Sequence, residues 1–236
     1  MYYYFDPTYI LVLIGIAICG LASANVSSTF NRYAKVLSAS GLTGAETARR
    51  ILEANGIYDV TIQRVSGNLT DHYNPSTKTV NLSESTYDRT SVAAVGVAAH
   101  ECGHVIQHHT NYAPINFRTA LVGPANLGSK LSWPLILIGL ILGGAGTSGT
   151  EIGMILVNIG ILLFCLAVLF QIVTLPVEFN ASSRALVQLE TLGILGHDEK
   201  KKAKKVLKAA ALTYVAAVAS SLLQLLRLIL IARRRD

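Results

Sequence analysis

The sequence predicts an α-helical multi-pass membrane protein that carries a small α+β domain. Hydrophobic residues make up 51% of the 236 residues and charged residues only 14%. This balance excludes an ordinary soluble domain. Long apolar runs alternate with two polar regions, and the larger polar region reads as short helices and strands. The three cysteines cannot form a closed set of disulfides, which argues against an extracellular disulfide scaffold.

Four apolar segments are candidates for membrane spans, at residues 9–26, 133–145, 152–176 and 209–232. A bilayer core of roughly 30 Å requires about 20 helical residues, so the first, third and fourth segments are long enough and the second is marginal. The glycine-rich tract at residues 143–149 predicts a turn. The second and third segments are therefore expected to form a transmembrane hairpin.

The first segment has two interpretations. The small residues Ala22, Ser23 and Ala24 resemble the cleavage site of a signal peptide. However, no Lys or Arg precedes the apolar run, and Arg32 and Lys35 follow it, which is the reverse of the charge order in a signal peptide. We therefore expect an uncleaved membrane anchor.

The distribution of positive charge predicts the orientation of the chain. Nine Lys and Arg residues lie between the first and second segments and seven between the third and fourth, whereas the hairpin turn has none. Positive loops favour the cytoplasmic side, so both polar regions are expected there and the N-terminus outside. Arg227 within the fourth segment, and Arg233 to Arg235 after it, leave open whether this segment spans the bilayer, lies shallow or bends back.

The larger polar region has recognisable local signals. Thr43 and Glu46 have the spacing of a capping box before an amphipathic helix, and Gly56 marks its end. Residues 60–65 alternate like a strand, and residues 69–83 read as two strands joined by a turn at residues 74–77. Thr90 or Ser91 can cap the helix that follows. We expect the run from Thr61 to Ser83 to supply an edge strand near whatever His100 and His104 bind.

His100, Glu101 and His104 follow a run of small apolar residues. On a helix, residues four apart share a face, so both imidazoles can point at one metal ion. This H-E-x-x-H pattern is typical of a site in which one zinc ion polarises a carbonyl and acidifies its bound water. Glu101 is then the catalytic residue that takes the water proton and passes it to the leaving amine. The alternative is a helix end with solvated histidines.

Such a zinc site requires a third protein ligand, and several residues compete for this role. His108 lies about 12 Å along a straight helix from His100, too far to share the ion. The extended motif with a third histidine fails because Gln107 and Thr110 occupy its glycine and histidine positions. His108 and His109 therefore read as a polar helix end. The remaining polar candidates read as turn or loop residues: Asp71, His72, His197, Asp198 and Glu199.

Glu178 is the stronger candidate for the third metal ligand. Two spans separate Lys130 from Glu178, so the chain returns to the membrane face that it left. By the same count, Glu151 lies on the opposite face. The alternative is that Pro176 and Glu178 simply begin a helix at the membrane surface, where a proline and an acidic residue are favoured.

Five stretches in this order carry a resemblance to a known family: "SGLTGAETARRILEANG", "LTDHYNPSTKTVNLSE", "VGVAAHECGHVIQH", "NLGSKLSWPLILIG" and "LFQIVTLPVEFNASSRAL". The chain resembles, over nearly its whole length, the YugP-type family of bacterial membrane zinc metallopeptidases. The resemblance implies a multi-pass membrane peptidase with one zinc ion, His100, His104 and Glu178 as metal ligands, and Glu101 as the catalytic carboxylate.

A looser resemblance is to HtpX-type membrane peptidases, whose third-ligand segment reads E-x-x-A-D. Here the segment is "EFNAS", with Ser182 at the position of the aspartate. A carboxylate that orients a zinc-bound histidine therefore cannot be carried over to this chain. Ser182 or Asn180 can replace it by hydrogen bonding.

These observations combine into a domain organisation with five parts. We expect a transmembrane anchor at residues 1–26 and a zincin-like cytoplasmic region with the H-E-x-x-H helix at residues 27–131. A transmembrane hairpin at residues 132–176 and a third-ligand helix with a basic segment at residues 177–208 follow. A hydrophobic helix with a basic tail at residues 209–236 completes the chain.

The expected function is zinc-dependent hydrolysis of peptide bonds at the cytoplasmic face of the cell membrane. The expected partners are the lipid bilayer and peptide or protein substrates, including membrane-associated chains. The alternative is a zinc-binding membrane scaffold or regulator without turnover, which the missing aspartate favours and Glu101 disfavours. A transporter is less favoured because the spans show no internal repeat. Nucleic acid is not expected as a partner, because the basic run "HDEKKKAKK" at residues 197–205 adjoins a membrane segment and lacks interleaved aromatic residues.

Overall fold

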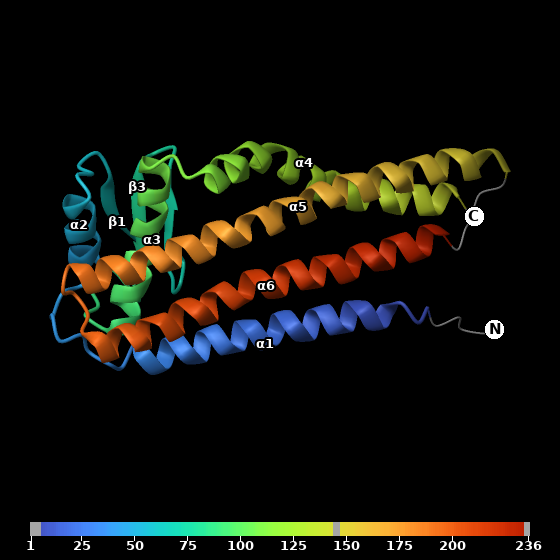
Figure 1. Ribbon diagram of the computed structural model, residues 1–236. Helices are drawn as coiled ribbons and strands as arrows, with labels where there is room; N and C mark the ends of the chain where they lie inside the picture. The colour runs from blue at the N-terminus through green and yellow to red at the C-terminus, as the bar shows by residue number, and fades with distance from the viewer. Residues whose placement is uncertain (1–5, 144–146, 234–236) are drawn as a thin grey trace. The chain divides into compact units, whose positions relative to one another are not determined.

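The computed structural model describes residues 6–143 and 147–233 (Figure 1). Its contacts divide the chain into two units. The mixed unit comprises Ala22–Asn116 and Leu175–Thr213, and the helical unit comprises Met1–Leu21, Phe117–Thr174 and Tyr214–Asp236. In order, the elements are α1 (Tyr9–Tyr33), α2 (Gly44–Ala54), β1 (Thr61–Val65), β2 (His72–Asn74), β3 (Thr79–Ser83), α3 (Val92–His109), α4 (Ala113–Leu142), α5 (Thr147–Thr191) and α6 (His197–Arg233).

The sheet of the mixed unit has three strands in the order β1-β3-β2. The central strand, β3, pairs with β1 in parallel and with β2 antiparallel. The predicted turn between β2 and β3 is confirmed, because Oδ1 of Asn74 accepts hydrogen bonds from the backbone N–H groups of Ser76 and Thr77. β3 is buried along its whole length, whereas β2 is an edge strand.

The predicted ends of α2 are also confirmed. The Thr43 side chain accepts the Glu46 N–H, and the Glu46 carboxylate accepts the Thr43 N–H, so the capping box is complete. Gly56 follows the helix with a φ of +70°, a left-handed conformation that glycine adopts without a Cβ penalty. Local sequence signals are therefore sufficient to set this helix.

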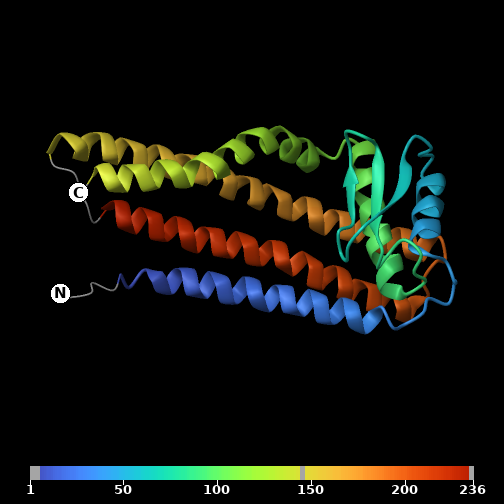
Figure 2. The same ribbon diagram turned by 180° about the vertical axis from the view of Figure 1, so that it is seen from behind.

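Helix α3 forms the centre of the mixed unit. The predicted cap at its start is Ser91, whose Oγ accepts the Ala94 N–H at 3.2 Å. The sheet lies behind α3 in Figure 1 and in front of it in Figure 2, while the C-terminal part of α5 passes on the opposite side. The apolar first half of α3 is buried except for the partly exposed Val97, and its residues Val92, Val95, Ala98 and Ala99 join a core with α2, the sheet, α5 and α6.

Two glycines of α3 face neighbouring helices at different distances. A Cβ built on Gly103 would lie only 2.5 Å from the carbonyl oxygen of Ala181 in α5, and that backbone atom cannot move aside cheaply. A Cβ on Gly96 would instead lie 3.4 Å from the Cβ of Ala203 in α6, which is ordinary contact. Gly103 therefore permits α3 and α5 to approach each other closely.

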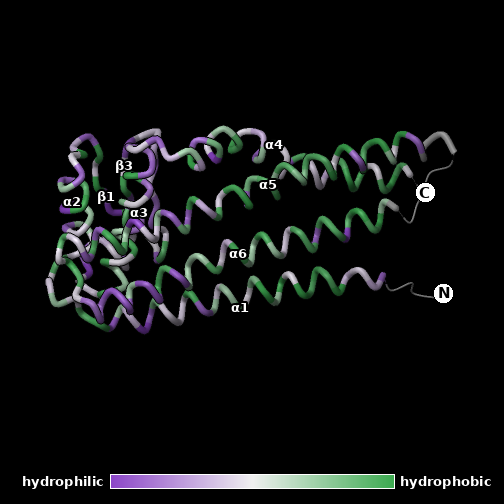
Figure 3. The backbone as a smooth tube through the Cα atoms, viewed as in Figure 1, coloured by the Kyte–Doolittle hydropathy of each residue, from purple (hydrophilic) through white to green (hydrophobic). Residues whose placement is uncertain are grey.

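The helical unit contains two contacting pairs of apolar helices (Figure 3). Gly139 of α4 and Gly153 of α5 approach so closely that a Cβ on either would contact the partner's backbone. A Cβ on Gly15 of α1 would instead meet a side chain, since it would lie 2.6 Å from Oγ of Ser220 in α6. Small residues at helix contacts are typical of packing within membranes. In the described residues, four helices are long and apolar enough to cross a bilayer: α1, α4, α5 and α6.

The helix boundaries differ from the sequence-based ones in three places. The marginal second segment is the end of the longer helix α4, which begins at Ala113 and runs through Pro124 and Pro134. Helix α5 continues through Pro176 to Thr191, so residues 177–191 do not form a separate helix, and Glu178 does not begin one. Helix α6 already begins at His197, in a segment read as loop. Residues 144–146 of the expected turn, and Arg234 and Arg235, lie outside the described residues.

Arg227, the charge within the fourth apolar segment, has partners inside the helical unit. Its Nη2 lies 4.0 Å from Oδ2 of Asp6, and its guanidinium carbon lies 4.2 Å from the centre of the Tyr9 ring. A charge within an apolar helix is costly unless it is paired, and these contacts satisfy that condition. Helix α6 is continuous through this position.

We predict that Gly103→Ala destabilises the mixed unit by about 1–3 kcal/mol, because the new methyl group overlaps the Ala181 carbonyl and forces α3 and α5 apart. Thermal unfolding of the purified protein in detergent measures this effect. Gly96→Ala is the matched control in the same helix. It is expected to stabilise by roughly 0.5–1 kcal/mol, since alanine is the better helix former and its methyl group has room. Equal unfolding temperatures for the two variants would contradict the close approach at Gly103.

Candidate metal centre

Helices α3 and α5 bring three of the predicted site residues together. Oε2 of Glu178 lies 3.3 Å from Nε2 of His100 and 3.6 Å from Nε2 of His104. The two imidazole rings stand edge to face, with their centres 4.8 Å apart. One ligand atom from each of the three residues lies within 4.8 Å of the others, a grouping that could hold a metal ion. All three residues belong to the mixed unit.

The spacing and chemistry of this group fit zinc. Ligand atoms about 2.0–2.1 Å from a tetrahedral zinc ion lie about 3.3 Å from one another. The two distances to Glu178 are close to this value. Glu178 is only 3% exposed, and its Oε2 has no hydrogen-bond partner, although a buried carboxylate oxygen is costly without one. Two imidazoles and a carboxylate are also a ligand set found in zinc enzymes.

Glu101 is buried beside these ligands and is 6% exposed. Burial raises the pKa of its carboxyl group, because the charged form loses hydration. Positive charge on His100 and His104 acts in the opposite direction, and the negative charges of Asp71 and Glu178 add to the increase. The buried surroundings of Glu101 therefore favour the protonated form of its carboxyl group more than exposure to solvent water would.

His104 has opposing influences on its pKa. Burial lowers the pKa of His104, whereas the contact with Glu178 and the charge of Glu101 raise it, with a net increase.

Cys102, which lies between Glu101 and His104 in the sequence, is fully buried, and its Sγ lies 3.6 Å from the Ala48 carbonyl oxygen. Burial raises the pKa of the Cys102 thiol, so this residue is a neutral packing group.

The second nitrogen of each histidine also has a partner. Nδ1 of His100 lies 3.1 Å from Oγ of Ser182, the residue that replaces the aspartate of the E-x-x-A-D segment. Nδ1 of His104 lies 3.0 Å from Oε1 of Gln107, whose amide nitrogen bonds Asn180. The sequence did not predict these contacts of Gln107, which was considered only as the residue that breaks the extended motif. Its position three residues after His104, on the same helix face, was the available signal.

The other histidines of α3 lie outside this group. The ring of His108 packs edge-on against Tyr73 of β2, with their centres 5.5 Å apart. His108 and His109 line a small cavity of about 240 Å³ together with Tyr73. The edge strand β2 therefore contacts the end of α3 beyond His104, and its Tyr73 meets His108 and not the two histidines of the motif.

Asp71 precedes β2, His72 begins it, and Asp71 bonds the last residue of β3. The carboxylate of Asp71 accepts hydrogen bonds from the backbone N–H and the hydroxyl of Ser83, each at 2.8 Å. His72 is exposed, and its Nδ1 lies 2.9 Å from the Thr70 carbonyl oxygen. Neither residue belongs to the metal-binding group.

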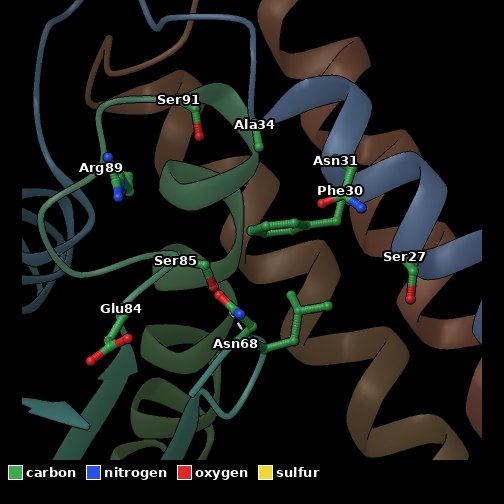
Figure 4. A pocket seen from close by; sticks show the side chains of 10 residues that line it. Ser27, Phe30, Asn31, Ala34, Asn68, Glu84, Ser85, Arg89 and Ser91 are labelled. Carbon is green, nitrogen blue, oxygen red and sulfur yellow. Dashed lines mark hydrogen bonds between the residues drawn. The ribbon is translucent and has the colours of Figure 1, made fainter. Parts of the chain in front are cut away.

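A larger cavity of about 560 Å³ lies elsewhere in the mixed unit (Figure 4). Phe30 and Asn31 near the end of α1 form one side, and Asn68, Glu84 and Arg89 belong to the loops facing them. None of the candidate ligands lines this cavity, and neither does Glu101. The candidate metal-binding group and this cavity are therefore separate features.

Comparison with known proteins gives the family. The family described as "Putative neutral zinc metallopeptidase" matches residues 8–233. The chain belongs to this family. It is 45% identical over 225 residues to the protein named "Putative membrane protease YugP" of Bacillus subtilis (strain 168), a match that covers 94% of this chain and 96% of that protein. No solved structure matches the chain. The family resemblance expected from the sequence is thus confirmed.

We predict that Glu178→Ala removes stoichiometric zinc from the purified protein, because the two histidines alone leave the ion without its carboxylate ligand. Zinc content after dialysis, measured by atomic emission, is expected to fall well below roughly one ion per chain. Glu190→Ala is the matched control on the same helix, since Glu190 is exposed and pairs with Lys200. Full zinc content in Glu178→Ala would end the assignment of Glu178 as a ligand.

Proposed function

We propose that this protein is a membrane-embedded zinc endopeptidase whose metal ligands are His100, His104 and Glu178. The observation that carries the proposal is the buried Glu178 oxygen that faces both Nε2 atoms and has no hydrogen-bond partner. Membership of a zinc metallopeptidase family and the similarity to a membrane protease support it. A zincin-like fold of the mixed unit is part of the same proposal.

When bound, a zinc ion supplies a Lewis acid that polarises the peptide carbonyl and acidifies a water molecule. The residues of the chain bind the ion and transfer the protons. Glu101 accepts the proton of the attacking water and passes it to the leaving amine, a role that its position between the two histidines supports. Burial of the site lowers the local dielectric and strengthens these electrostatic interactions.

The substrates in this proposal are peptide or protein chains, including membrane-associated ones, and the site faces the cytoplasm. The seven Lys and Arg residues between the apolar parts of α5 and α6, together with the nine between the apolar parts of α1 and α4, support that side. No nucleic-acid partner is proposed.

A zinc-binding scaffold or regulator without turnover is the second candidate. Ser182 at the position of an aspartate favours it, because carboxylate partners make ligand histidines more basic. Retention of a buried glutamate at position 101 opposes it. Zinc binding alone does not require this carboxylate, whereas peptide hydrolysis does.

We predict that Glu101→Gln lowers peptide cleavage by at least about 100-fold, since a general base contributes roughly 10²–10⁴ to the rate. Zinc content is expected to stay unchanged, because Glu101 is not a ligand in this proposal. The measurement is cleavage of a broad peptide library by the purified full-length protein, with and without a chelator.

The control for this prediction is Glu53→Gln, which alters an exposed glutamate on α2 and is expected to retain full activity. If Glu101→Gln cleaves as fast as the unmodified chain, Glu101 is not the base. If the unmodified protein binds zinc but cleaves no peptide in the library, the scaffold function is favoured instead.

The proposed orientation can be tested with epitope tags. A tag in the exposed turn at residues 75–77 is expected to resist protease added to intact cells, because the mixed unit is cytoplasmic in this proposal. A tag after α6 is expected to be cleaved, because four spans return the chain to the side of the N-terminus. Lysed cells, in which both tags are cleaved, provide the control. Cleavage of the turn tag in intact cells would reverse the orientation.

A further inference from the structure

A chain of hydrogen bonds continues from His104 into the interior between α3 and α5. Gln107 is fully buried, with its Oε1 3.0 Å from Nδ1 of His104. Its Nε2 donates to the Val177 carbonyl oxygen at 2.7 Å and to Oδ1 of Asn180 at 3.0 Å. The same Asn180 oxygen accepts a hydrogen bond from Nε of Arg184 at 2.8 Å.

The chemistry of the outer partners fixes the direction of every bond in this chain. The Val177 carbonyl can only accept, so the Gln107 atom that faces it must be the amide nitrogen. Arg184 can only donate, so Asn180 presents its oxygen to both Arg184 and Gln107. A flipped Gln107 amide would place its carbonyl oxygen against two acceptors.

The orientation of Gln107 then determines which ring nitrogen of the neutral His104 side chain carries the hydrogen. Oε1 of Gln107 must face Nδ1 of His104, and an amide oxygen can only accept. Nδ1 therefore carries the hydrogen. In the neutral imidazole this leaves the lone pair on Nε2, the atom that lies 3.6 Å from Glu178.

We propose that Gln107 is the positioning residue that holds His104 in the tautomer able to bind the metal ion, with Asn180 and Arg184 fixing Gln107. This inference rests on the proposed zinc site. It assigns to a buried amide the role that a carboxylate has beside many zinc-bound histidines.

A neutral partner suits this buried site. Glu101 and Glu178 already place two carboxylates there, with exposed fractions of 6% and 3%. A third carboxylate behind His104 would add like charge in a region of low dielectric, at a high desolvation cost. The Gln107 amide oxygen accepts the hydrogen bond from Nδ1 of His104, as a carboxylate would, without adding charge.

His100 does not have a partner that fixes its tautomer in this way. Its Nδ1 partner is the Ser182 hydroxyl, which can donate or accept. The hydrogen bond between them therefore does not by itself select one tautomer of His100. The directional constraint acts through His104.

The first test is Gln107→Leu in the full-length protein, which keeps the side-chain volume but leaves Nδ1 of His104 without its acceptor. Zinc affinity, measured by competition with a chromophoric chelator in detergent, is expected to fall about 10–100-fold. The absorption bands of the cobalt-substituted protein are expected to shift as well. Gln188→Leu is the matched control, since Gln188 is a partly buried glutamine of α5 that bonds Asn55 instead.

The second test separates positioning from stability by changing Asn180. Asn180→Asp retains an oxygen that accepts from both Gln107 and Arg184, so zinc affinity is expected to stay within a few-fold of the unmodified protein. Asn180→Leu removes that oxygen and is expected to weaken zinc binding. The unfolding temperature of each metal-free variant shows whether the fold itself has changed, and these variants also cover the case in which Gln107→Leu fails to fold.

Unchanged zinc affinity in Gln107→Leu and Asn180→Leu would overturn the role of Gln107, even though zinc binding and cleavage by the unmodified protein would stand. Equal losses in Asn180→Asp and Asn180→Leu would also overturn it, because the direction of the hydrogen bonds would then be irrelevant. If the unmodified protein binds no zinc, both the proposed function and this inference fail.

Discussion

The candidate metal centre depends on the close approach of α3 and α5 at Gly103 and Ala181. With no side chain at Gly103, the Ala181 carbonyl reaches the surface of α3. Within about one helical turn of this contact, Glu178 meets the two histidines and Gln107 meets Asn180. Each of these polar contacts requires the two backbones to lie within reach of short side chains. A bulkier residue at position 103 would therefore separate the ligands as well as loosen the core.

Electrostatics gives this arrangement its chemical character. The mixed unit buries two carboxylates and two imidazoles together, which is costly for any unpaired charge. The polar partners of the imidazoles are a hydroxyl and an amide, so they add no charge to that of Glu101, Glu178 and the histidines, and Asp71 adds a further negative charge that acts on Glu101. A divalent cation between His100, His104 and Glu178 would neutralise much of this negative charge and would satisfy the otherwise unpartnered oxygen of Glu178.

Helix α5 links the candidate centre to an apolar candidate span within one element of 45 residues. In its C-terminal part, Glu178, Ala181, Ala185 and Leu189 are all nearly fully buried and recur with the spacing of one helix face. The rotation of α5 that packs its alanines and leucine into the core therefore also directs Glu178 toward α3. Because the helix does not break at Pro176, the position of the third ligand follows from the packing of this face.

The sequence by itself determined the local features: the capping box at Thr43, the turn after β2, the cap at Ser91, the apolar helices, and the H-E-x-x-H spacing that puts His100 and His104 on one face. These depend on residues a few positions apart, where backbone geometry fixes the outcome. It also predicted Glu178 as a third ligand, through span parity, although that assignment remains a proposal. Only the tertiary structure revealed the continuity of α5 through Pro176, and the hydrogen bonds of Gln107, Asn180 and Arg184. Their partners lie on different helices, and helix packing decides which buried polar groups meet.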